Sequence, residues 1–295
     1  FISHCFVSKE FGKVMSTENL DIKLNCNSSG QTIVTHQYTT HPLRLSGVFR
    51  LDTMDPRTAY LYLINTSPGL LAGDNLSLSL QLEKGTSVYL TDQAAIKVHA
   101  MPMIATKANT NIKIKVEAGA RLELVAEPII LFADAALEQT TYIQLHSRAE
   151  LFWSEIILPG RLARGEWYEF RYYFSQLEIT SMTEEVCFRD AIHLEGKQNI
   201  FKHRDLFAAK PVLANLIVVQ PYSDLEVLSQ KLENLEAANC PDLLLGSSIL
   251  PNNKGLLVRA LASKTPQIKR YIKYALNCVR NLTNRSSLPY ISIRN

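Results

Sequence analysis

The sequence predicts a mostly β protein, in which an elongated, solenoid-like stack of strands is followed by a small C-terminal α+β part carrying two helices. Between Leu20 and about Gly196, short runs alternate apolar and polar residues and are separated by Gly, Asn, Asp and Pro, a pattern typical of half-buried strands. Near residue 222 the spacing of the apolar residues changes from two to between three and four, which predicts amphipathic helices.

These patterns divide the chain of 295 residues into three parts. Residues 1–14 precede Met15, a plausible start, and are predicted to be a disordered N-terminal extension. Residues 15–206 are predicted to form the β-rich core. Residues 207–295 are predicted to form the C-terminal α+β segment.

A weak internal repeat lies inside the β-rich core. Aligning Gly85, Gly119 and Arg148 brings apolar residues into register three and five positions before and after each of them. Each copy then reads as strand, tight turn and strand, with its apolar residues on one face. Stacked repeats would give this pattern, and so would independent hairpins in a sandwich. The aligned residues are Leu80, Leu82, Val88 and Leu90, then Ile114, Val116, Leu122 and Leu124, then Ile143, Leu145, Leu151 and Trp153.

The C-terminal segment is predicted to alternate strands and helices. A capping box that starts at Ser223 predicts the beginning of one helix, and Thr265 followed by Pro266 predicts the beginning of a second. The predicted elements are a strand at 211–221, a helix near 223–238, strands at 243–251 and 255–262, and a helix near 266–281. The expected solvated side of the second helix consists of Lys269, Arg270, Lys273 and Arg280.

Composition excludes several classes of partner. The net charge is only +3 and no block of Lys or Arg stands out, so we expect no nucleic-acid partner. No apolar run approaches the roughly 20 residues of a membrane span, so we expect no membrane partner. The five cysteines are scattered and odd in number, which favours reduced thiols and a cytoplasmic protein over a disulfide framework.

The stretch NTSPGLLAGDNLSL, residues 65–78, could be taken for a phosphate-binding loop. A P-loop needs a lysine directly after its second glycine, but Asp74 follows Gly73 here and would repel phosphate. A dinucleotide loop opens a helix, whereas LSLSLQL predicts a strand. We therefore interpret this stretch as a turn between strands, and nucleotide binding is kept as an alternative.

No catalytic constellation stands out in the sequence. The seven histidines show none of the spacings of a zinc site, and no G-x-S-x-G motif occurs. Residues 99–103, His-Ala-Met-Pro-Met, are the one local cluster of soft ligands that would suit Cu(I), although such a cluster is usually only a loop. The enzymatic alternative is a β-solenoid hydrolase or lyase that uses clustered carboxylates.

Five segments occur in an order that identifies a family. They are THPLRL at 40–45, LINTSPGLLAGD at 63–74, LTDQAAIKV at 90–98, GARLELVAEPIILF at 119–132 and SEIILPGRLARGE at 154–166. With the later SSILPNNKGLLVRALA, they make the chain resemble the urease accessory protein D family, called H in some bacteria, over about residues 19–265. The residues that carry the family motifs are Asn65, Gly69, Gly73, Asp74, Gln93, Lys97, Pro128, Gly160, Arg161, Arg164, Gly165 and Glu166.

The chain also departs from the family pattern. Pro68 and Ala72 stand where the family usually has glycine, Asp92 and Ile96 replace threonines, and His99 replaces a common tyrosine. Proline still suits a turn, whereas alanine disfavours a positive φ. We expect the loop to be slightly reshaped.

The resemblance implies a non-catalytic scaffold with a long β fold. Such a protein binds apo-urease and, with urease accessory proteins F and G, of which G is a GTPase, supports nickel delivery to the urease active site. No cofactor is expected to be tightly bound, and nickel is expected only in transit. Part of the C-terminal surface is predicted to help accessory protein F dock; the alternative is that both helices only cover the β core.

A route for nickel is predicted on the inner face of the repeats. Asp92 and Glu155 both stand seven positions after the turn residue, on the nominally buried side, and Glu127 adjoins the equivalent Ala126. Oxygen ligands would hold a divalent ion weakly, because nickel prefers nitrogen. The alternatives are a salt bridge with a basic residue, Lys97 or Arg161, and a bulge that turns the acids outward.

The segment GRLARGE carries a second prediction. The guanidinium groups of Arg161 and Arg164 flank a turn that ends on Glu166. Because arginine binds carboxylates with two hydrogen bonds, these residues are predicted to fix a corner of the fold or to contact urease. The alternative is a solvated turn.

Overall fold

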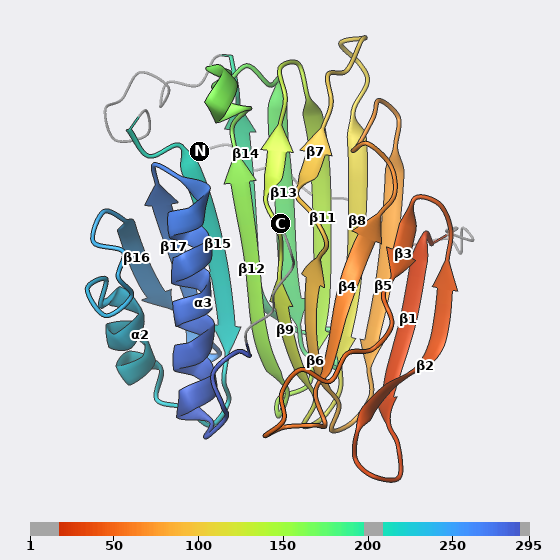
Figure 1. The fold of residues 1–295 in the computed structure, drawn as a ribbon, viewed down its shortest axis with the longest axis vertical. Coiled ribbons are helices and arrows are strands. Elements are labelled where there is room, and N and C mark those ends of the chain that lie inside the picture. The colour runs from red at the N-terminus through yellow and green to blue at the C-terminus, as the bar shows by residue number, and fades with distance from the viewer. Residues whose placement is uncertain (1–17, 198–208, 290–295) are drawn as a thin grey trace.

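The computed structural model describes residues 18–197 and 209–289, and the predicted extension at 1–14 lies outside these residues. The described chain is mostly β, as predicted, with two stacked sheets and two α-helices (Figure 1). The smaller sheet has the order β14 (Val186–Glu195), β13 (Tyr172–Thr180), β11 (Ala136–Leu145), β8 (Ala108–Val116), β5 (Asn75–Leu82), β1 (Leu20–Cys26) and β2 (Thr32–Thr39).

The larger sheet lies behind α3 and carries all of the C-terminal strands. Its order is β16 (Leu244–Ile249), β17 (Leu256–Ala262), β15 (Val212–Val219), β12 (Glu150–Leu158), β9 (Arg121–Val125), β6 (Ser87–Asp92), β4 (Ala59–Asn65) and β3 (Leu43–Leu45). Two short strands, β7 (Ile96–Val98) and β10 (Ile129–Leu131), pair with each other, and β10 also pairs with β12.

The register predicted by the repeat is confirmed. Ile114 pairs with Leu80 on one side and with Ile143 on the other, in parallel strands of the smaller sheet. Leu122 pairs in the same way with Val88 and Leu151 in the larger sheet. Each copy therefore places its first strand in one sheet and its second strand in the other, unlike a hairpin of two paired strands. The two sheets are not closed into a coil, so the solenoid-like description is not confirmed.

The two sheets bury an apolar core between their inner faces. The period-two alternation of each strand places the aligned repeat residues in this core. Leu80 and Ile114 from the smaller sheet, and Leu122 from the larger, are each at most 2% exposed. Burial of apolar surface on this scale is the main stabilising term of the fold.

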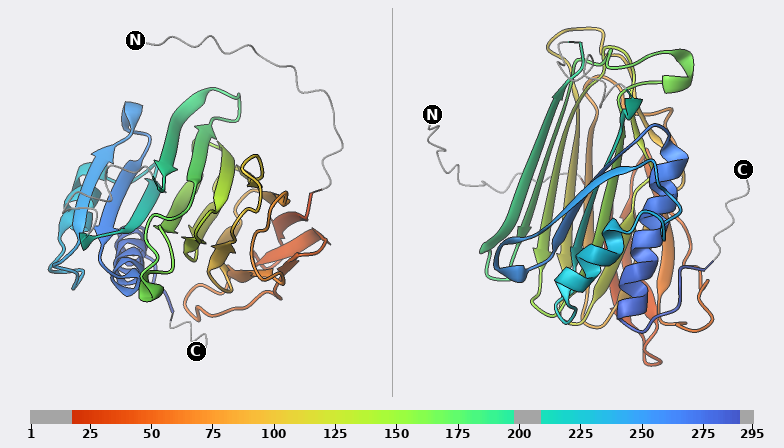
Figure 2. Two further views of the ribbon diagram at one scale, coloured as in Figure 1. Left: turned by 90° about the horizontal axis from the view of Figure 1, so that it is seen from above. Right: turned by 90° about the vertical axis from the view of Figure 1, so that its left-hand side faces the viewer.

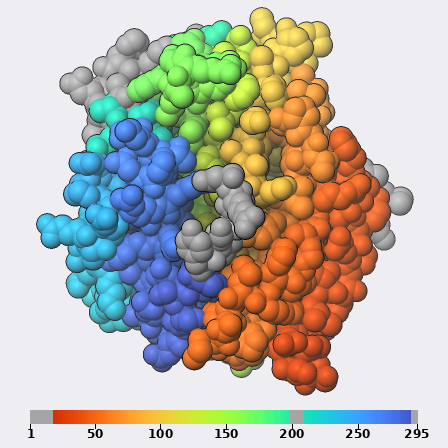
Figure 3. Space-filling view, in the orientation of Figure 1, coloured from red at the N-terminus to blue at the C-terminus, as the bar shows by residue number. Residues whose placement is uncertain are grey.

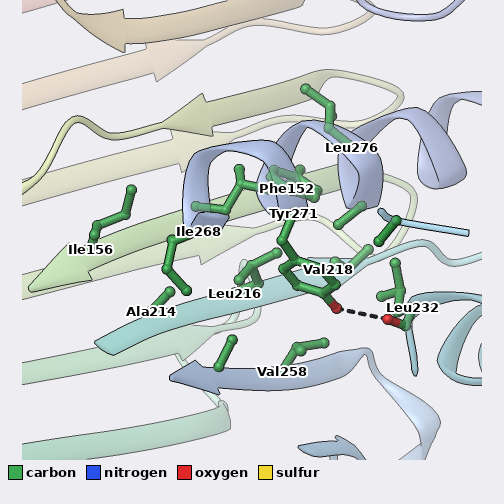
Figure 4. Packing of buried hydrophobic residues seen from close by; sticks show 14 of the residues in the cluster. Phe152, Ile156, Ala214, Leu216, Val218, Leu232, Val258, Ile268, Tyr271 and Leu276 are labelled. Carbon is green, nitrogen blue, oxygen red and sulfur yellow. Dashed lines mark hydrogen bonds between the residues drawn. The ribbon is translucent and has the colours of Figure 1, made fainter. Parts of the chain in front are cut away.

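The C-terminal segment extends the larger sheet and covers its outer face. The strand β15 runs antiparallel to β12, and α2 (Leu225–Glu233) and α3 (Thr265–Leu282) lie over the sheet on the side away from the smaller sheet (Figure 2). The helix α3 buries its apolar face against β12, β15 and β17, and the Tyr271 hydroxyl donates to the Leu232 carbonyl at 3.0 Å (Figure 4). None of the described helices is both long and apolar enough to cross a membrane.

Three details of the helices differ from the sequence prediction. Asp224, not Ser223, caps α2, because its carboxylate accepts from the Glu226 and Val227 amides. The helix α3 starts at Thr265, so Lys264 is its N-cap. Arg280 does not lie on the solvated side but is only 2% exposed, because ionic partners within the fold hold it there. Two short 3-10 helices, η1 (Leu162–Arg164) and η3 (Pro251–Asn253), complete the described elements.

Candidate functional site

Several motif residues form a corner where β4 and β6 end. Asn65 accepts from the Ser67 amide at 2.9 Å, and Asp74 accepts from the Leu71 amide at 2.8 Å, so the loop satisfies its own polar groups. Gly69 has a φ of +146°, and a Cβ there would lie 2.4 Å from the Lys97 carbonyl oxygen. This close approach to β7 explains the glycine by packing, and no cradle for a phosphate is needed.

The other motif residues of this region have backbone conformations and hydrogen bonds that support the fold. Gly73 has a φ of +85°, whereas the preceding Ala72 has no positive φ, so the departure at Ala72 introduces no strain. The backbone amide of Gln93 donates to the Leu63 carbonyl, and the backbone amide of Ile96 donates to the Pro128 carbonyl. His99 lies 3.1 Å from the Pro68 carbonyl oxygen. In the described parts of the chain, no group of three or more His, Cys, Asp or Glu is placed to hold a metal ion.

The GRLARGE segment forms a second corner. Gly160 has a φ of +149°, and a Cβ there would lie 2.1 Å from the Glu166 carbonyl oxygen. The Arg161 guanidinium forms an ion pair with Glu166, which also accepts from the Ala133 amide at 2.9 Å. Partial burial would raise the pKa of Glu166. The hydrogen bond from Arg161 opposes this effect, and the net shift of the pKa is downward.

The two arginines of this segment have different surroundings. Arg161 packs over the Phe132 ring, 4.5 Å from its centroid, whereas Arg164 is exposed in η1. Gly165 ends η1 in the left-handed conformation, with a φ of 73°. Arg161 therefore pairs across the corner, and Arg164 is free of the packing that holds Arg161.

The acids predicted on the inner face come together in one cavity. Asp92, Glu127 and Glu155 line a cavity of about 80 Å³, and Ala126 lies in its wall. The Oδ2 atom of Asp92 accepts from the Glu127 amide at 3.0 Å. The alternative of a salt bridge is not found among the described residues: Arg161 pairs with Glu166, and Lys97 is exposed. Asp92 and Glu155 are not turned outward by a bulge, since both line this inner cavity.

Glu155 lies inside the fold among neutral donors. It is 3% exposed, and its Oε1 atom accepts from the Tyr173 hydroxyl at 2.7 Å and from the Gln139 amide at 2.6 Å. Its Oε2 atom accepts from the Asn215 amide at 3.2 Å, and Ser175 lies 3.4 Å from Oε1. Burial raises the pKa of Glu155 more than these hydrogen bonds lower it.

Asp92 is the second carboxyl group with a shifted pKa. Burial of the carboxyl raises its pKa to about 7, and the charge of Glu127 acts in the same direction, although the Glu127 amide opposes them. Asp92 therefore changes protonation closer to neutral pH than an ordinary carboxyl group does, and the pKa of Glu155 is shifted in the same direction.

A gap in the larger sheet lies beside this cavity. The strand β9 ends at Val125, paired with Ser154, and β10 begins at Ile129, paired with Ile157. Residues 126–128 lie between these two ladders. The cavity is therefore placed where the sheet between β6 and β12 is interrupted.

Two further cavities adjoin the first. One, of about 110 Å³, shares Asp92 and Leu63 with it and lies under the 65–74 loop. The other, of about 260 Å³, shares Thr91, Ala126 and Glu127 with it and lies beside α3 on the outer face. Figure 3 views this face, on which α3 (blue) faces the N-terminal strands (orange to red). We call the three the loop cavity, the acidic cavity and the outer pocket; their shared walls place them in a row.

Unsatisfied polar atoms lie at the acidic cavity. Ser154 is fully buried, and neither its Oγ atom nor the Oδ1 atom of Asn215, whose side-chain amide donates to Glu155, has a hydrogen-bond partner among the described residues. A cavity of this size admits water, whose oxygen would satisfy such atoms. The neutral donors around Glu155 were missed by sequence reasoning, because Gln139 and Tyr173 come from the opposite sheet and no local pattern connects them to Glu155.

Comparison with known proteins identifies the family. The sequence model of the UreD urease accessory protein family matches residues 17–292. The urease accessory protein UreD of Trichodesmium erythraeum (strain IMS101) is 97% identical over 278 residues, which cover 94% of this chain and 100% of that protein. UreD of Haloarcula marismortui is 28% identical over 88% of this chain and 85% of its own length. UreH of Helicobacter hepaticus is 26% identical over 86% of this chain and 95% of its own length. The chain belongs to the UreD urease accessory protein family, whose members are accessory proteins and not enzymes.

Proposed function

We propose that this protein is a scaffold for urease maturation that binds apo-urease and, together with urease accessory proteins F and G, supports the delivery of nickel. Family membership supports the general role, and it removes the hydrolase or lyase alternative. The nucleotide alternative loses its basis, because Asp74 and Asn65 close the glycine-rich loop on itself. The cytoplasmic location stays a prediction.

We further propose that nickel, as cargo, crosses the protein through the acidic cavity. The observation that carries this proposal is the row of three cavities, with Asp92 on the wall between the first two and Glu127 on the wall between the last two. Glu155 lines the middle cavity without a cationic partner among the described residues. Carboxylate oxygens bind a divalent cation less tightly than imidazole nitrogens would bind nickel, which suits transfer.

The test is to block the passage without adding or removing charge. Ala126→Leu places a larger side chain in a wall shared by the acidic cavity and the outer pocket. We expect urease matured with this variant to contain less nickel, measured by elemental analysis, while co-purification with the partners is unchanged. Ala100→Leu, at an exposed loop position, is the matched control. Normal nickel content with an intact complex would overturn the passage.

Docking of accessory protein F on the C-terminal surface has to be tested by point substitutions and not by deletion. The apolar face of α3, including Ile268, Tyr271 and Leu276, is buried on the sheet. Removing residues 265–295 would expose that core, since each such side chain contributes roughly 1.5–3 kcal/mol when buried. Deletion therefore cannot separate docking from folding. Accessory protein F would instead meet exposed groups such as Arg270.

Arg164 is the exposed residue that best tests contact with urease. Because it lies outside the packed corner, Arg164→Ala should change the free energy of unfolding by less than about 0.5 kcal/mol. We propose that it lowers the yield of the complex with apo-urease and urease activation in cells. Unchanged yield and unchanged activation would remove Arg164 from the partner surface.

A further inference from the structure

The wall between the acidic cavity and the outer pocket contains one charged residue. The residues that line both are Thr91, Ala126 and Glu127. The Thr91 hydroxyl is occupied, because it donates to the Val125 carbonyl at 2.6 Å. Ala126 has no polar side chain. A cation that moves between the two spaces therefore meets Glu127, the only carboxylate that the described residues place on their shared wall.

Glu127 is already paired with a cationic side chain, that of Lys269. Its backbone amide donates to Asp92 at 3.0 Å, and its carboxylate forms an ion pair with the Lys269 ammonium from the second turn of α3. Lys269 lines the outer pocket and not the acidic cavity. The ammonium group therefore approaches Glu127 from outside the sheet, on the side opposite to Asp92 and Glu155.

The acidic cavity has capacity for a hydrated cation beyond its carboxylates. The Asn215 side chain donates to Glu155, which lines the cavity, and the buried Asn215 Oδ1 atom has no hydrogen-bond partner among the described residues. A buried polar atom that lacks a partner is costly, so it points to a water molecule or an ion beside Glu155. Oxygen atoms of this kind are the ligands that a hydrated divalent cation accepts.

We propose that Lys269 is a gate on this passage, whose ammonium group competes with a divalent cation for the Glu127 carboxylate. This proposal rests on the proposed passage and names the residue that controls it. With Lys269 in place, Glu127 is neutralised and the wall offers no free carboxylate. When Lys269 swings into the outer pocket, Glu127 can bind a cation from the acidic cavity and pass it to the outer face.

The ion pair is suited to opening and closing. The Lys269 side chain is 45% exposed and the Glu127 side chain 22%, so water can replace either partner. A lysine ammonium is a point charge on a flexible four-carbon stem, which allows it to leave without moving α3. The gate therefore needs no change in the backbone, and a partner that offers a carboxylate at the outer pocket could open it.

The experiment measures how fast nickel enters and leaves the isolated protein. The full chain is loaded with Ni²⁺ and mixed in a stopped-flow instrument with an excess of a colorimetric chelator. Lys269→Gln should release nickel about fivefold faster, the factor that corresponds to the roughly 1 kcal/mol of an exposed ion pair. Uptake should accelerate by a similar factor, so the dissociation constant should change little. Lys269→Arg keeps the cation and should restore the slow rates.

Lys273→Gln is the matched control, because Lys273 lines the same pocket one helical turn further along. It should leave both rates within a factor of about two of the wild type. Equal rates in the wild type and Lys269→Gln would overturn the gate, even if urease maturation in cells depends on the passage. Absence of bound nickel in both proteins would overturn it as well. A gated release that has no effect on urease nickel content would instead overturn the proposed function alone.

Discussion

Two regions of this molecule bury a carboxylate in different ways. Around Glu123, which is 2% exposed, the protein supplies arginines from the end of α3 and the residues after it. Around Glu155, which is 3% exposed, it supplies only neutral donors. The first carboxylate is compensated by fixed cations, whereas the second has no cationic partner in the described chain.

The Glu123 cluster ties the C-terminal segment to the β core. The Arg280 Nε atom donates to both oxygens of Glu123 at 3.1 Å, and Arg285 donates to Oε1 at 2.6 Å. Tyr60 lies 3.4 Å from the Arg280 guanidinium. Burial would lower the pKa of Arg280, but the charge of Glu123 raises it more, so this group stays charged. The charges are fixed in place and not available to a mobile ion.

The difference between the Glu123 and Glu155 sites indicates a structural role for the first and allows ion binding at the second. A buried charge that is already paired holds two parts of the chain together but offers nothing to a third ion. A buried carboxyl that is held by hydroxyl and amide groups keeps its geometry and can still attract a cation or take up a proton. The predictions below test whether the two regions differ in this way.

The largest expected effect is on the paired region. Arg280→Met leaves Glu123 buried with Arg285 as its one charged partner among the described residues, so the free energy of unfolding should fall by about 3–5 kcal/mol. Urea unfolding followed by fluorescence measures this change. Nickel transfer should be unaffected in the molecules that remain folded.

Two variants control for this loss. Adding Glu123→Gln to Arg280→Met removes the buried negative charge, while Arg285 keeps Glu150 at 3.5 Å, and should restore most of the stability. Arg189→Met, which breaks the exposed pair with Glu178, should cost less than about 1 kcal/mol. A loss of that small size for Arg280→Met would show that burial does not distinguish the two pairs.

A smaller effect is expected from the pH dependence of Asp92. Its pKa of about 7 in the folded protein exceeds the roughly 3.9 of an unfolded chain, so the folded state binds the extra proton. The contribution of this carboxyl to the free energy of unfolding is fully present below the pKa of the unfolded chain. It is lost as the pH rises from there to about 7, the pKa in the folded protein. Asp92→Asn removes that loss, so the variant should gain about 2–3 kcal/mol over the wild type between pH 5 and pH 8.

The measurement is the difference in the free energy of unfolding between variant and wild type across this pH range. Asp242→Asn, at an exposed position, is the control variant. A flat difference for Asp92→Asn would mean that this carboxyl is ionised at pH 5 and that its surroundings are less apolar than the structure indicates.

The paired and unpaired regions also differ in how far the sequence predicts them. The period-two alternation of β6 and β12 was enough to place Asp92 and Glu155 on the inner face, because strand periodicity is a local property. Their cavity follows from the same register. Its neutral donors could not be predicted, since Tyr173 and Asn215 meet Glu155 only through the stacking of sheets and the antiparallel pairing of β15.

The burial of Arg280 could not be predicted from the sequence. A charged residue on an amphipathic helix is usually solvated, and that rule placed Arg280 on the outer side of α3. The structure buries it because Glu123, 157 positions earlier in the chain, lies beneath the helix. No local pattern carries that information, whereas the apolar face of α3 was predicted correctly from its spacing.

A still smaller effect on stability than that of Asp92→Asn is expected where the charge of Glu155 is removed and its shape is kept. In Glu155→Gln the retained oxygen still accepts from Tyr173 and Gln139. The new amide can donate to Asn215 Oδ1, which has no partner among the described residues, once the Asn215 amide has turned. The free energy of unfolding should therefore change by less than about 1 kcal/mol, while the nickel content of urease falls.

Glu155→Leu separates the charge from the hydrogen bonds. It leaves the Tyr173 hydroxyl and the Gln139 amide unpaired inside the fold, and each unpaired group costs roughly 1–3 kcal/mol. Chemical unfolding should rank the proteins as wild type, then Glu155→Gln, then Glu155→Leu, whereas nickel loading should be reduced equally in both variants. If Glu155→Gln lost as much stability as Glu155→Leu, the charge itself would hold the fold together. The acidic cavity would then be a structural site like that of Glu123, and the difference between the two regions would disappear.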